Sequence, residues 1–205
     1  MKDLGSLHYC LGIEFSQVEG KLKMSQAKYI DDLLRKFNME DSKTVTTPMD
    51  PSQKFTTEMC PKNEAERSEM EDIPYQSLIG SLMYLSVATR PDITHRVNFL
   101  SQFNNNPGKL HWQAAKRILR YLKLTRDQSI EFKKTGEPLT AFADANFASC
   151  TSDRRSFTGF ICKHAGGAIT WEARKQRTVA LSTTEAEYMA LSETSKEVVY
   201  LRRVF

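Results

Sequence analysis

The spacing of apolar residues changes across residues 133–138, and this change restricts the chain to a mixed fold. Before that segment, residues 75–125 place apolar side chains three and four positions apart, which is the spacing of helices. After it, residues 139–173 follow a strand-like pattern that is typical of half-buried sheets. Glycine and proline lie within the segment itself, so we expect a domain boundary there. The sequence therefore predicts an α/β (α+β) protein.

Other patterns precede the helical region. Residues 7–24 alternate as paired strands do, with a turn at residues 18–21, which predicts a β-hairpin. An amphipathic helix is expected over residues 26–39. The predicted segments are residues 1–40 (hairpin and first helix), residues 41–74 (a mostly exposed connector), residues 75–134 (a helical region) and residues 139–205 (a sheet followed by one long helix).

Finer boundaries follow from local signals. The helix that starts at Tyr75 should end before Pro91, because the residue before proline avoids helical dihedral angles. Asp92 can cap the next helix, which runs through Phe103. A third helix is expected over residues 110–125. Beyond the boundary we expect strands at residues 139–147, 157–164 and 168–173, a tight turn at residues 165–167, an extended stretch at residues 176–181 and a helix over residues 182–205.

Asp144 is the first residue that can carry chemistry. It lies within Ala141-Phe142-Ala143-Asp144-Ala145-Asn146-Phe147, where strand alternation places it on one face with Phe142 and Asn146. A carboxylate among aromatic and small side chains is costly unless a cation accompanies it. An aspartate in a turn at the end of a strand is the alternative, and the strand alone does not choose between them.

Glu187 is the second residue that can carry chemistry. Ser182 and Glu185 have the spacing of a capping box, which gives Glu185 a structural role. At helical spacing, Glu187 shares a face with Leu191, Thr194, Val198 and Leu201, the stripe that we expect to pack on the sheet. In the alternative register, Thr184 is the cap and Glu187 is its partner.

One carboxylate on the first strand and another on the first helix, both facing one cleft, form the arrangement of a two-metal phosphodiesterase. In such enzymes two Mg²⁺ ions activate a water molecule and stabilise the leaving oxygen. Magnesium needs more than two protein ligands. Asp153 is a weaker third candidate, because it adjoins Arg154 and Arg155 and an ordinary surface ion pair also explains it.

Positive charge is more organised than the net charge of +4 suggests. Within the third helix, Lys116, Arg120 and Lys123 recur at i, i+4 and i+7 opposite an apolar stripe. A solvated helix face explains any one such cluster. Several clusters together favour a nucleic-acid backbone, whose phosphates they would position without reading sequence. The remaining candidates for this role are Arg154, Arg155 and Lys175.

Other signals are negative. Tyr29-Ile30-Asp31-Asp32 imitates a polymerase metal motif, but it lies within helical periodicity, so both aspartates are expected on a solvated face. The four cysteines are scattered and fit packing roles in a reducing compartment. No apolar run approaches the length of a membrane span, and no secretory signal is expected.

Short motifs occur in a fixed order along nearly the whole chain. They are Leu11-Gly12-Ile13-Glu14-Phe15, Thr89-Arg90-Pro91-Asp92-Ile93, His111-Trp112, Ala143-Asp144-Ala145, Asp153-Arg154-Arg155-Ser156, Ala168-Ile169-Thr170-Trp171 and Thr184-Glu185-Ala186-Glu187-Tyr188. In this combination the chain resembles the Pol polyprotein of copia-type retrotransposons, from the C-terminal part of reverse transcriptase into the N-terminal half of ribonuclease H.

The resemblance implies a β-hairpin that holds the primer end, a helical thumb and connection that follow the duplex, and an incomplete ribonuclease H-like sheet with one long helix. It assigns Asp144 and Glu187 as the first two of four acidic ligands for Mg²⁺ in the intact enzyme. The implied partners are an RNA–DNA hybrid and the remaining parts of the Pol polyprotein. The implied location is intracellular, either in cytoplasmic virus-like particles or in the nucleus.

Departures from the family pattern lower the activity that we expect. The polymerase aspartates are expected before Met1, and the last two nuclease carboxylates after Phe205. Asn146 stands where the family usually has a second aspartate, and Leu124 replaces a usual glycine. We therefore expect an internal fragment with weak or no hydrolysis. A non-catalytic nucleic-acid-binding remnant and a degenerate product without function are the alternatives.

Overall fold

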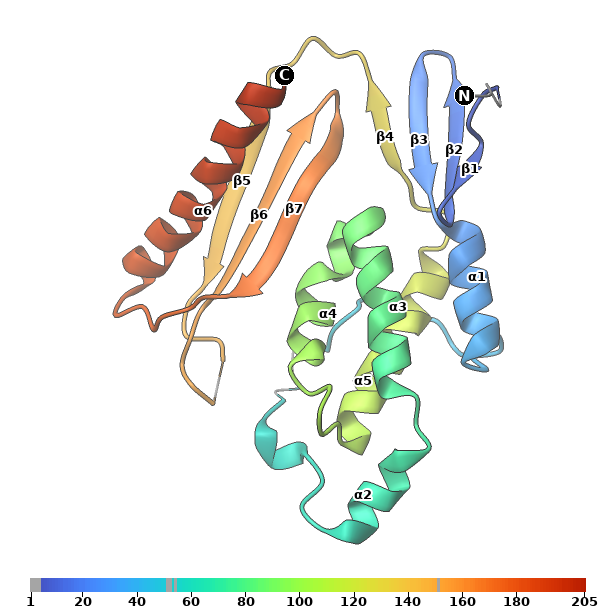
Figure 1. Ribbon diagram of the computed structural model, residues 1–205, viewed down its shortest axis with the longest axis vertical. Coiled ribbons are helices and arrows are strands. Elements are labelled where there is room, and N and C mark those ends of the chain that lie inside the picture. Colours follow the sequence, from blue (N-terminus) through green and yellow to red (C-terminus); the bar gives the residue numbers. More distant parts are fainter. Residues whose placement is uncertain (1–4, 51–52, 54, 151) are drawn as a thin grey trace. The chain divides into compact units, whose positions relative to one another are not determined.

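The computed structural model describes residues 5–50, 53, 55–150 and 152–205 (Figure 1). The chain divides into two compact units, one up to Lys133 and one from Lys134. Helices and antiparallel sheets are both present, which confirms the predicted fold class. The finer division into four segments stays a prediction. Among the described residues, no helix is long and apolar enough to cross a membrane.

The first unit contains a four-stranded antiparallel sheet in the order β1-β2-β3-β4. The predicted hairpin is confirmed and consists of β2 (Ile13–Val18) and β3 (Lys21–Ser25), preceded by the short β1 (Tyr9–Cys10). Strand β4 (Ile130–Lys133) was not predicted and pairs with β3. Four residues are too few to show alternation clearly, and the partner strand lies far away along the chain.

The three tight hairpins share one turn geometry. In each, both central residues have positive φ and the second is glycine, which is the type I′ turn that matches the twist of paired strands. The central pairs are Leu11–Gly12, Glu19–Gly20 and Ala165–Gly166, with φ between 50° and 79°. The predicted turns at residues 18–21 and 165–167 are therefore confirmed.

The described residues of the first unit form five α-helices. They are α1 (Ala27–Lys36), α2 (Glu64–Glu71), α3 (Tyr75–Ala88), α4 (Thr94–Ser101) and α5 (Lys109–Leu124), with 3₁₀ turns at Thr57–Met59 and Pro91–Ile93. The helices predicted from residues 26, 75 and 110 are thus confirmed. The apolar faces of α1, α3, α4 and α5 meet in one cluster that includes the fully buried Leu78, Leu82 and Ile118, and no described residue of α2 belongs to it. The sequence did not predict α2 or the burial of Phe55 in this core.

His111 belongs to the aromatic part of this core. Its ring stacks on Phe103 at 3.9 Å between centroids, and the Phe55 ring lies 5.6 Å away. Its Nδ1 accepts a hydrogen bond of 2.9 Å from the Gly108 amide. Burial and the charge of Arg96 lower the pKa of His111 to about 4. The ring is therefore neutral at physiological pH and acts as a packing group.

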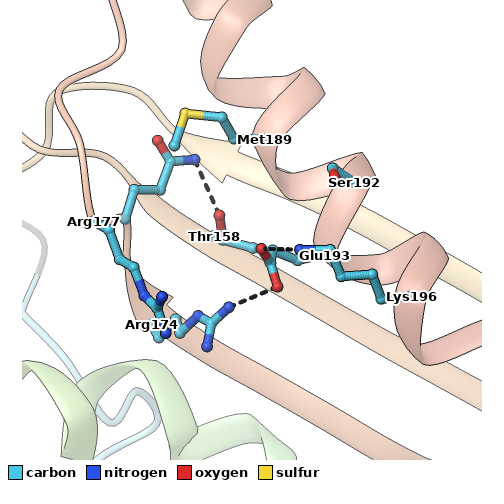
Figure 2. A pocket seen from close by; sticks show the side chains of 8 residues that line it. Thr158, Arg174, Arg177, Met189, Ser192, Glu193 and Lys196 are labelled. Atoms are coloured by element: carbon cyan, nitrogen blue, oxygen red, sulfur yellow. Dashed lines mark hydrogen bonds and ion pairs between the residues drawn. The ribbon is translucent and has the colours of Figure 1, made fainter.

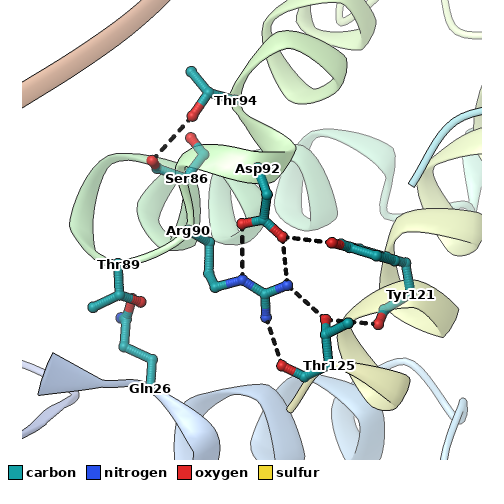
Figure 3. Close-up of polar contacts among 8 residues, drawn as sticks. All are labelled: Gln26, Ser86, Thr89, Arg90, Asp92, Thr94, Tyr121 and Thr125. Atoms are coloured by element: carbon teal, nitrogen blue, oxygen red, sulfur yellow. Dashed lines mark hydrogen bonds and ion pairs between the residues drawn. The ribbon is translucent and has the colours of Figure 1, made fainter. Parts of the chain in front are cut away.

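An ion pair between the buried Arg90 and the partly exposed Asp92 joins three helices (Figure 3). Arg90, 2% exposed, donates to both carboxylate oxygens of Asp92, at 2.9 Å and 2.7 Å. It also donates to the carbonyl and hydroxyl oxygens of Thr125, at 3.1 Å and 2.6 Å, just after the last turn of α5. Tyr121 donates to Asp92 at 2.8 Å. The expectation that Asp92 caps a helix is wrong, because these donors occupy its carboxylate and α4 begins only at Thr94.

The second unit is a three-stranded antiparallel sheet with one helix. Its strands are β5 (Thr140–Asn146), β6 (Phe157–His164) and β7 (Gly167–Lys175), in that order, and α6 (Thr183–Val204) packs on β5 and β6. The three predicted strands and the long helix are confirmed. Residues 176–181 were expected to be extended but form no strand.

We predict that Arg90→Ala lowers the free energy of unfolding by about 1–3 kcal/mol, because it removes the donors to the Thr125 oxygens and to the partly exposed Asp92 carboxylate. Urea denaturation followed by Trp112 fluorescence in a Trp171→Phe background measures this for the first unit. Lys23→Ala is the matched control, since Lys23 forms an exposed pair with Glu131 and should change stability by less than about 1 kcal/mol. Equal losses in the two variants would contradict the prediction.

We also predict that the first unit loses stability as pH falls from about 6.5 towards 4. Folding lowers the pKa of His111 from 6.5 to about 4, so the unfolded chain binds more protons in this interval and is favoured there. The loss should approach about 3 kcal/mol at the lower end. His95, whose pKa burial also lowers, adds in the same direction. Denaturation of His111→Phe over the same pH range should have a smaller slope, and an unchanged slope would exclude His111 as the source.

Candidate functional site

Asp144 lies in the middle of β5, directly opposite Gly159 of β6. Its side chain is exposed, as are those of its neighbours Phe142 and Asn146. Among the described residues it has no hydrogen-bond or ion-pair partner. The neighbouring glycine leaves space beside the carboxylate. Asp144 is thus a free anionic group on a regular strand and does not belong to a turn.

Glu187 lies near the start of α6, and the cap of this helix leaves it free. Ser182 accepts a hydrogen bond of 3.1 Å from the Glu185 amide, and Glu185 accepts one of 2.7 Å from the Leu181 amide. The alternative register with Thr184 as cap is therefore wrong. Glu187 is exposed and, within the described part of the chain, has no polar partner.

The buried stripe of α6 differs from the predicted one. Thr194 and Leu201 are buried as expected, whereas Leu191 is 54% exposed. The stripe instead includes Ala186 and Ala190, both fully buried. Glu187 therefore lies beside the buried face of α6 and is not the first residue of that face.

The strand register places Asp144 on the sheet face that α6 does not cover. Arg174 of β7 lies opposite Thr158 of β6 and forms an ion pair of 2.8 Å with Glu193 of α6, so the face of Thr158 is the covered one. Asp144 pairs with Gly159, the next residue along β6, and side chains alternate between faces. The cleft that was expected to hold both Asp144 and Glu187 is therefore not formed on the sheet face that α6 covers. Strand β5, which carries Asp144, is an edge strand of this sheet.

Two residues of the basic stripe of α5 form hydrogen bonds with main-chain carbonyl groups elsewhere in the chain. Arg120 donates to the Lys43 carbonyl, and Lys123 donates to the carbonyls of Glu40 and Ser42. These contacts hold the start of the connector against α5. The third residue of the stripe, Lys116, places its ammonium 5.6 Å from the centre of the Trp112 ring.

Two of the predicted basic residues of the second unit pair with Asp153. Lys175 lies 2.7 Å and Arg155 3.6 Å from its carboxylate. Although burial raises it, hydrogen bonds from Lys175 and Cys150 lower the pKa of Asp153 to about 2. Asp153 is therefore the anion of a local ion-pair cluster, which is the alternative left open from sequence. The main-chain amide of Arg154 donates to the Cys150 carbonyl at 2.8 Å, and its side chain has no partner among the described residues.

A cavity of about 370 Å³ lies between β7 and α6 (Figure 2). Sequence analysis missed most of its lining, because the residues come from separate elements and form no motif. They are Thr158, Arg174, Gln176, Arg177, Met189, Ser192, Glu193 and Lys196. Arg174 and Arg177 are visible in the sequence only as part of a basic cluster.

Comparison with known proteins agrees with the sequence motifs. The family model described as "Reverse transcriptase (RNA-dependent DNA polymerase)" matches residues 1–51. The Retrovirus-related Pol polyprotein from transposon TNT 1-94 of Nicotiana tabacum is 45% identical over 205 residues, 99% of this chain. The corresponding polyprotein from transposon RE1 of Arabidopsis thaliana is 42% identical over 98% of this chain. The chain belongs to the copia-type retrotransposon Pol polyproteins.

This Pol segment spans about 15% of the tobacco polyprotein and about 13% of the Arabidopsis one. It is also 49% identical over 133 residues to Secreted RxLR effector protein 161 of Plasmopara viticola, and covers 94% of that protein. No solved structure matches the chain.

Metal ligands are incomplete in the described part of the Pol segment. The reverse transcriptase family generally uses divalent metal ions. Within residues 5–50, 53, 55–150 and 152–205, however, no group of three or more His, Cys, Asp or Glu side chains could hold one. Asp144 and Glu187 stay predicted ligands, and the described residues bring no third carboxylate to them.

We predict that Arg120→Ala combined with Lys123→Ala releases the start of the connector from α5. The variant loses hydrogen bonds from two cations to three carbonyl groups, so local opening should be more frequent. Trypsin should then cleave after Lys43 about tenfold faster under native conditions. Lys116→Ala, which removes a charge from the same helix but no bond to the connector, should leave this rate unchanged. Equal acceleration in both variants would contradict the tether.

Proposed function

We propose that this chain is the duplex-contacting part of a reverse transcriptase and ribonuclease H polyprotein. The parent protein would copy RNA into DNA and hydrolyse the RNA strand of the resulting hybrid. One observation carries this proposal: within the part of the chain that the structure describes, Asp144 and Glu187 are carboxylates without a polar partner, exposed on a strand and a helix that pack together. Carboxylates without protein partners are available for a divalent cation, and Mg²⁺ prefers oxygen ligands.

In the parent protein Asp144 and Glu187 would hold Mg²⁺ together with carboxylates from elsewhere. The ion supplies activation of a water molecule and stabilisation of the leaving oxygen. The two predicted ligands of this chain do not by themselves complete such a site among the described residues. We expect the chain alone to hydrolyse a hybrid weakly or not at all.

Contacts with the duplex would come from the basic residues. Within the α5 stripe, Lys116 has more donors available for phosphates than Arg120 or Lys123, because those two side chains donate hydrogen bonds to carbonyl groups of the connector. The side chain of Arg154 has no partner among the described residues, whereas Arg155 and Lys175 share Asp153. These side chains would bind phosphates and contribute no sequence readout.

A second candidate is a non-catalytic nucleic-acid-binding protein. The absence of a three-ligand metal group among the described residues favours it. It predicts that binding is independent of Asp144, whereas the catalytic proposal requires Asp144 once the missing ligands are supplied.

Binding and cleavage of a fluorescent RNA–DNA hybrid test the proposal. We expect affinity that falls steeply with salt, survives Asp144→Asn and drops in Lys116→Ala, whose salt slope should be smaller by about one. Lys62→Ala is the matched control, since Lys62 is an exposed lysine outside the stripe and should retain the wild-type slope. Salt-insensitive or absent binding would contradict nucleic-acid contact.

Incubation of the same hybrid with the chain and Mg²⁺ tests the expectation that the chain alone hydrolyses it weakly or not at all. Robust cleavage by the purified chain, abolished by Asp144→Asn or Glu187→Gln, would overturn it. Cleavage that appears only after addition of the downstream part of a related polyprotein, and that requires both carboxylates, would support the catalytic proposal over the non-catalytic one.

A further inference from the structure

The cavity between β7 and α6 has an excess of positive charge. Arg174, Arg177 and Lys196 line it together with a single carboxylate, Glu193 (Figure 2). Glu193 already accepts from Arg174 at 2.8 Å and from Lys196 at 2.9 Å. Its pKa lies below its ordinary value, chiefly because of the bond from Lys196. The Glu193 carboxylate is therefore shared, and Arg174 also lies 3.4 Å from Glu172, so one positive charge is left in excess.

Arg177 is the free cation of this cavity. Its side chain is exposed and, within the described part of the chain, has neither a hydrogen-bond nor an ion-pair partner. The hydroxyl of Ser192, one helix turn before Lys196, is likewise without a partner among those residues. A guanidinium and a free hydroxyl on facing walls are donors of the kind that bind phosphate oxygens.

Gln176 is a buried, hydrogen-bonded part of the cavity wall. This side chain is 5% exposed, and its Nε2 donates to Thr158 Oγ1 and to the Ala186 carbonyl, each at 3.0 Å. The Ala186 carbonyl fixes the orientation of the amide, since a flipped amide would set two oxygens against each other. Its Oε1 is buried and accepts no hydrogen bond.

From these groups we propose that the cavity binds a phosphate group and its attached sugar, with Arg177, Lys196 and Ser192 as the phosphate donors. A volume of about 370 Å³ is at the lower end of ligand pockets, which span about 300–1,000 Å³, and exceeds what a phosphate alone needs. The source that we favour is a nucleic-acid backbone, and this part of the inference rests on the proposed function.

The location gives the site a positioning role. The cavity includes Thr158 and Arg174, which lie on the sheet face covered by α6, whereas Asp144 lies on the opposite face. A backbone phosphate held here would belong to a nucleotide other than the one at the predicted metal ligands. It would fix the register of the strand without taking part in cleavage.

Titrations of the full chain with inorganic phosphate, adenosine monophosphate and an RNA–DNA hybrid test the site, with amide NMR as readout. We expect phosphate and adenosine monophosphate to shift the amide signals of Arg177 and Ser192, and Arg177→Ala to weaken both ligands about tenfold. Ser192→Ala should weaken them less. Arg202→Ala is the matched control, because Arg202 is an exposed arginine of α6 that does not line the cavity, and it should bind as the wild type does.

The outcomes separate this inference from the proposed function. Absence of shifts at Arg177 and Ser192 with either small ligand, or equal affinity in Arg177→Ala, overturns the phosphate site. Weaker hybrid binding in Arg177→Ala supports the nucleic-acid source, and unchanged hybrid binding beside weakened phosphate binding contradicts that source in favour of a free phosphate compound. Failure of the wild-type chain to bind any hybrid would contradict the proposed function and the nucleic-acid source, while the phosphate titrations still decide whether the cavity is a site.

Discussion

The ion pair between the buried Arg90 and the partly exposed Asp92 is the interaction on which the helical unit depends. It lies where α3 ends and α4 begins, and its spare donors reach Thr125 after α5, so one guanidinium fixes the ends of three helices. Beside it, Thr89 donates to Gln26 at 2.8 Å and connects α3 to the start of α1. A buried arginine is tolerated because its guanidinium donates to both carboxylate oxygens of Asp92 and to the carbonyl and hydroxyl oxygens of Thr125. The Thr89-Arg90-Pro91-Asp92 motif is therefore architectural.

Much of the fold was predictable from sequence because its signals are local. The stripes of α3 and α5, the type I′ turns and the cap at Ser182 each depend on residues a few positions apart. Strand β4 and the burial of Phe55 depend on partners far along the chain, which no local pattern reveals. Asp92 failed as a cap for the same reason, since its partner Tyr121 approaches from another helix.

The candidate site was predictable only at the level of which residues share a face. Alternation along β5 correctly grouped Asp144 with its exposed neighbours, but it does not state which face of the sheet α6 covers. Periodicity has the same limit on α5. A basic stripe such as that of Arg120 and Lys123 looks identical whether its partners are phosphates or, as here, backbone carbonyls of the connector. Both questions depend on tertiary packing, which a single sequence does not encode locally.

The pairing of β3 with β4 determines when the first unit can be completed during synthesis. Met24 lies opposite Ile130, so all helices of the unit are inserted between two neighbouring strands of one sheet. The hairpin can form early, yet the edge of β3 stays open until the last residues of the unit emerge from the ribosome. An open edge invites pairing with other chains. The contact between β3 and β4 is also one of the most distant in sequence within the unit, and contacts of this kind slow folding.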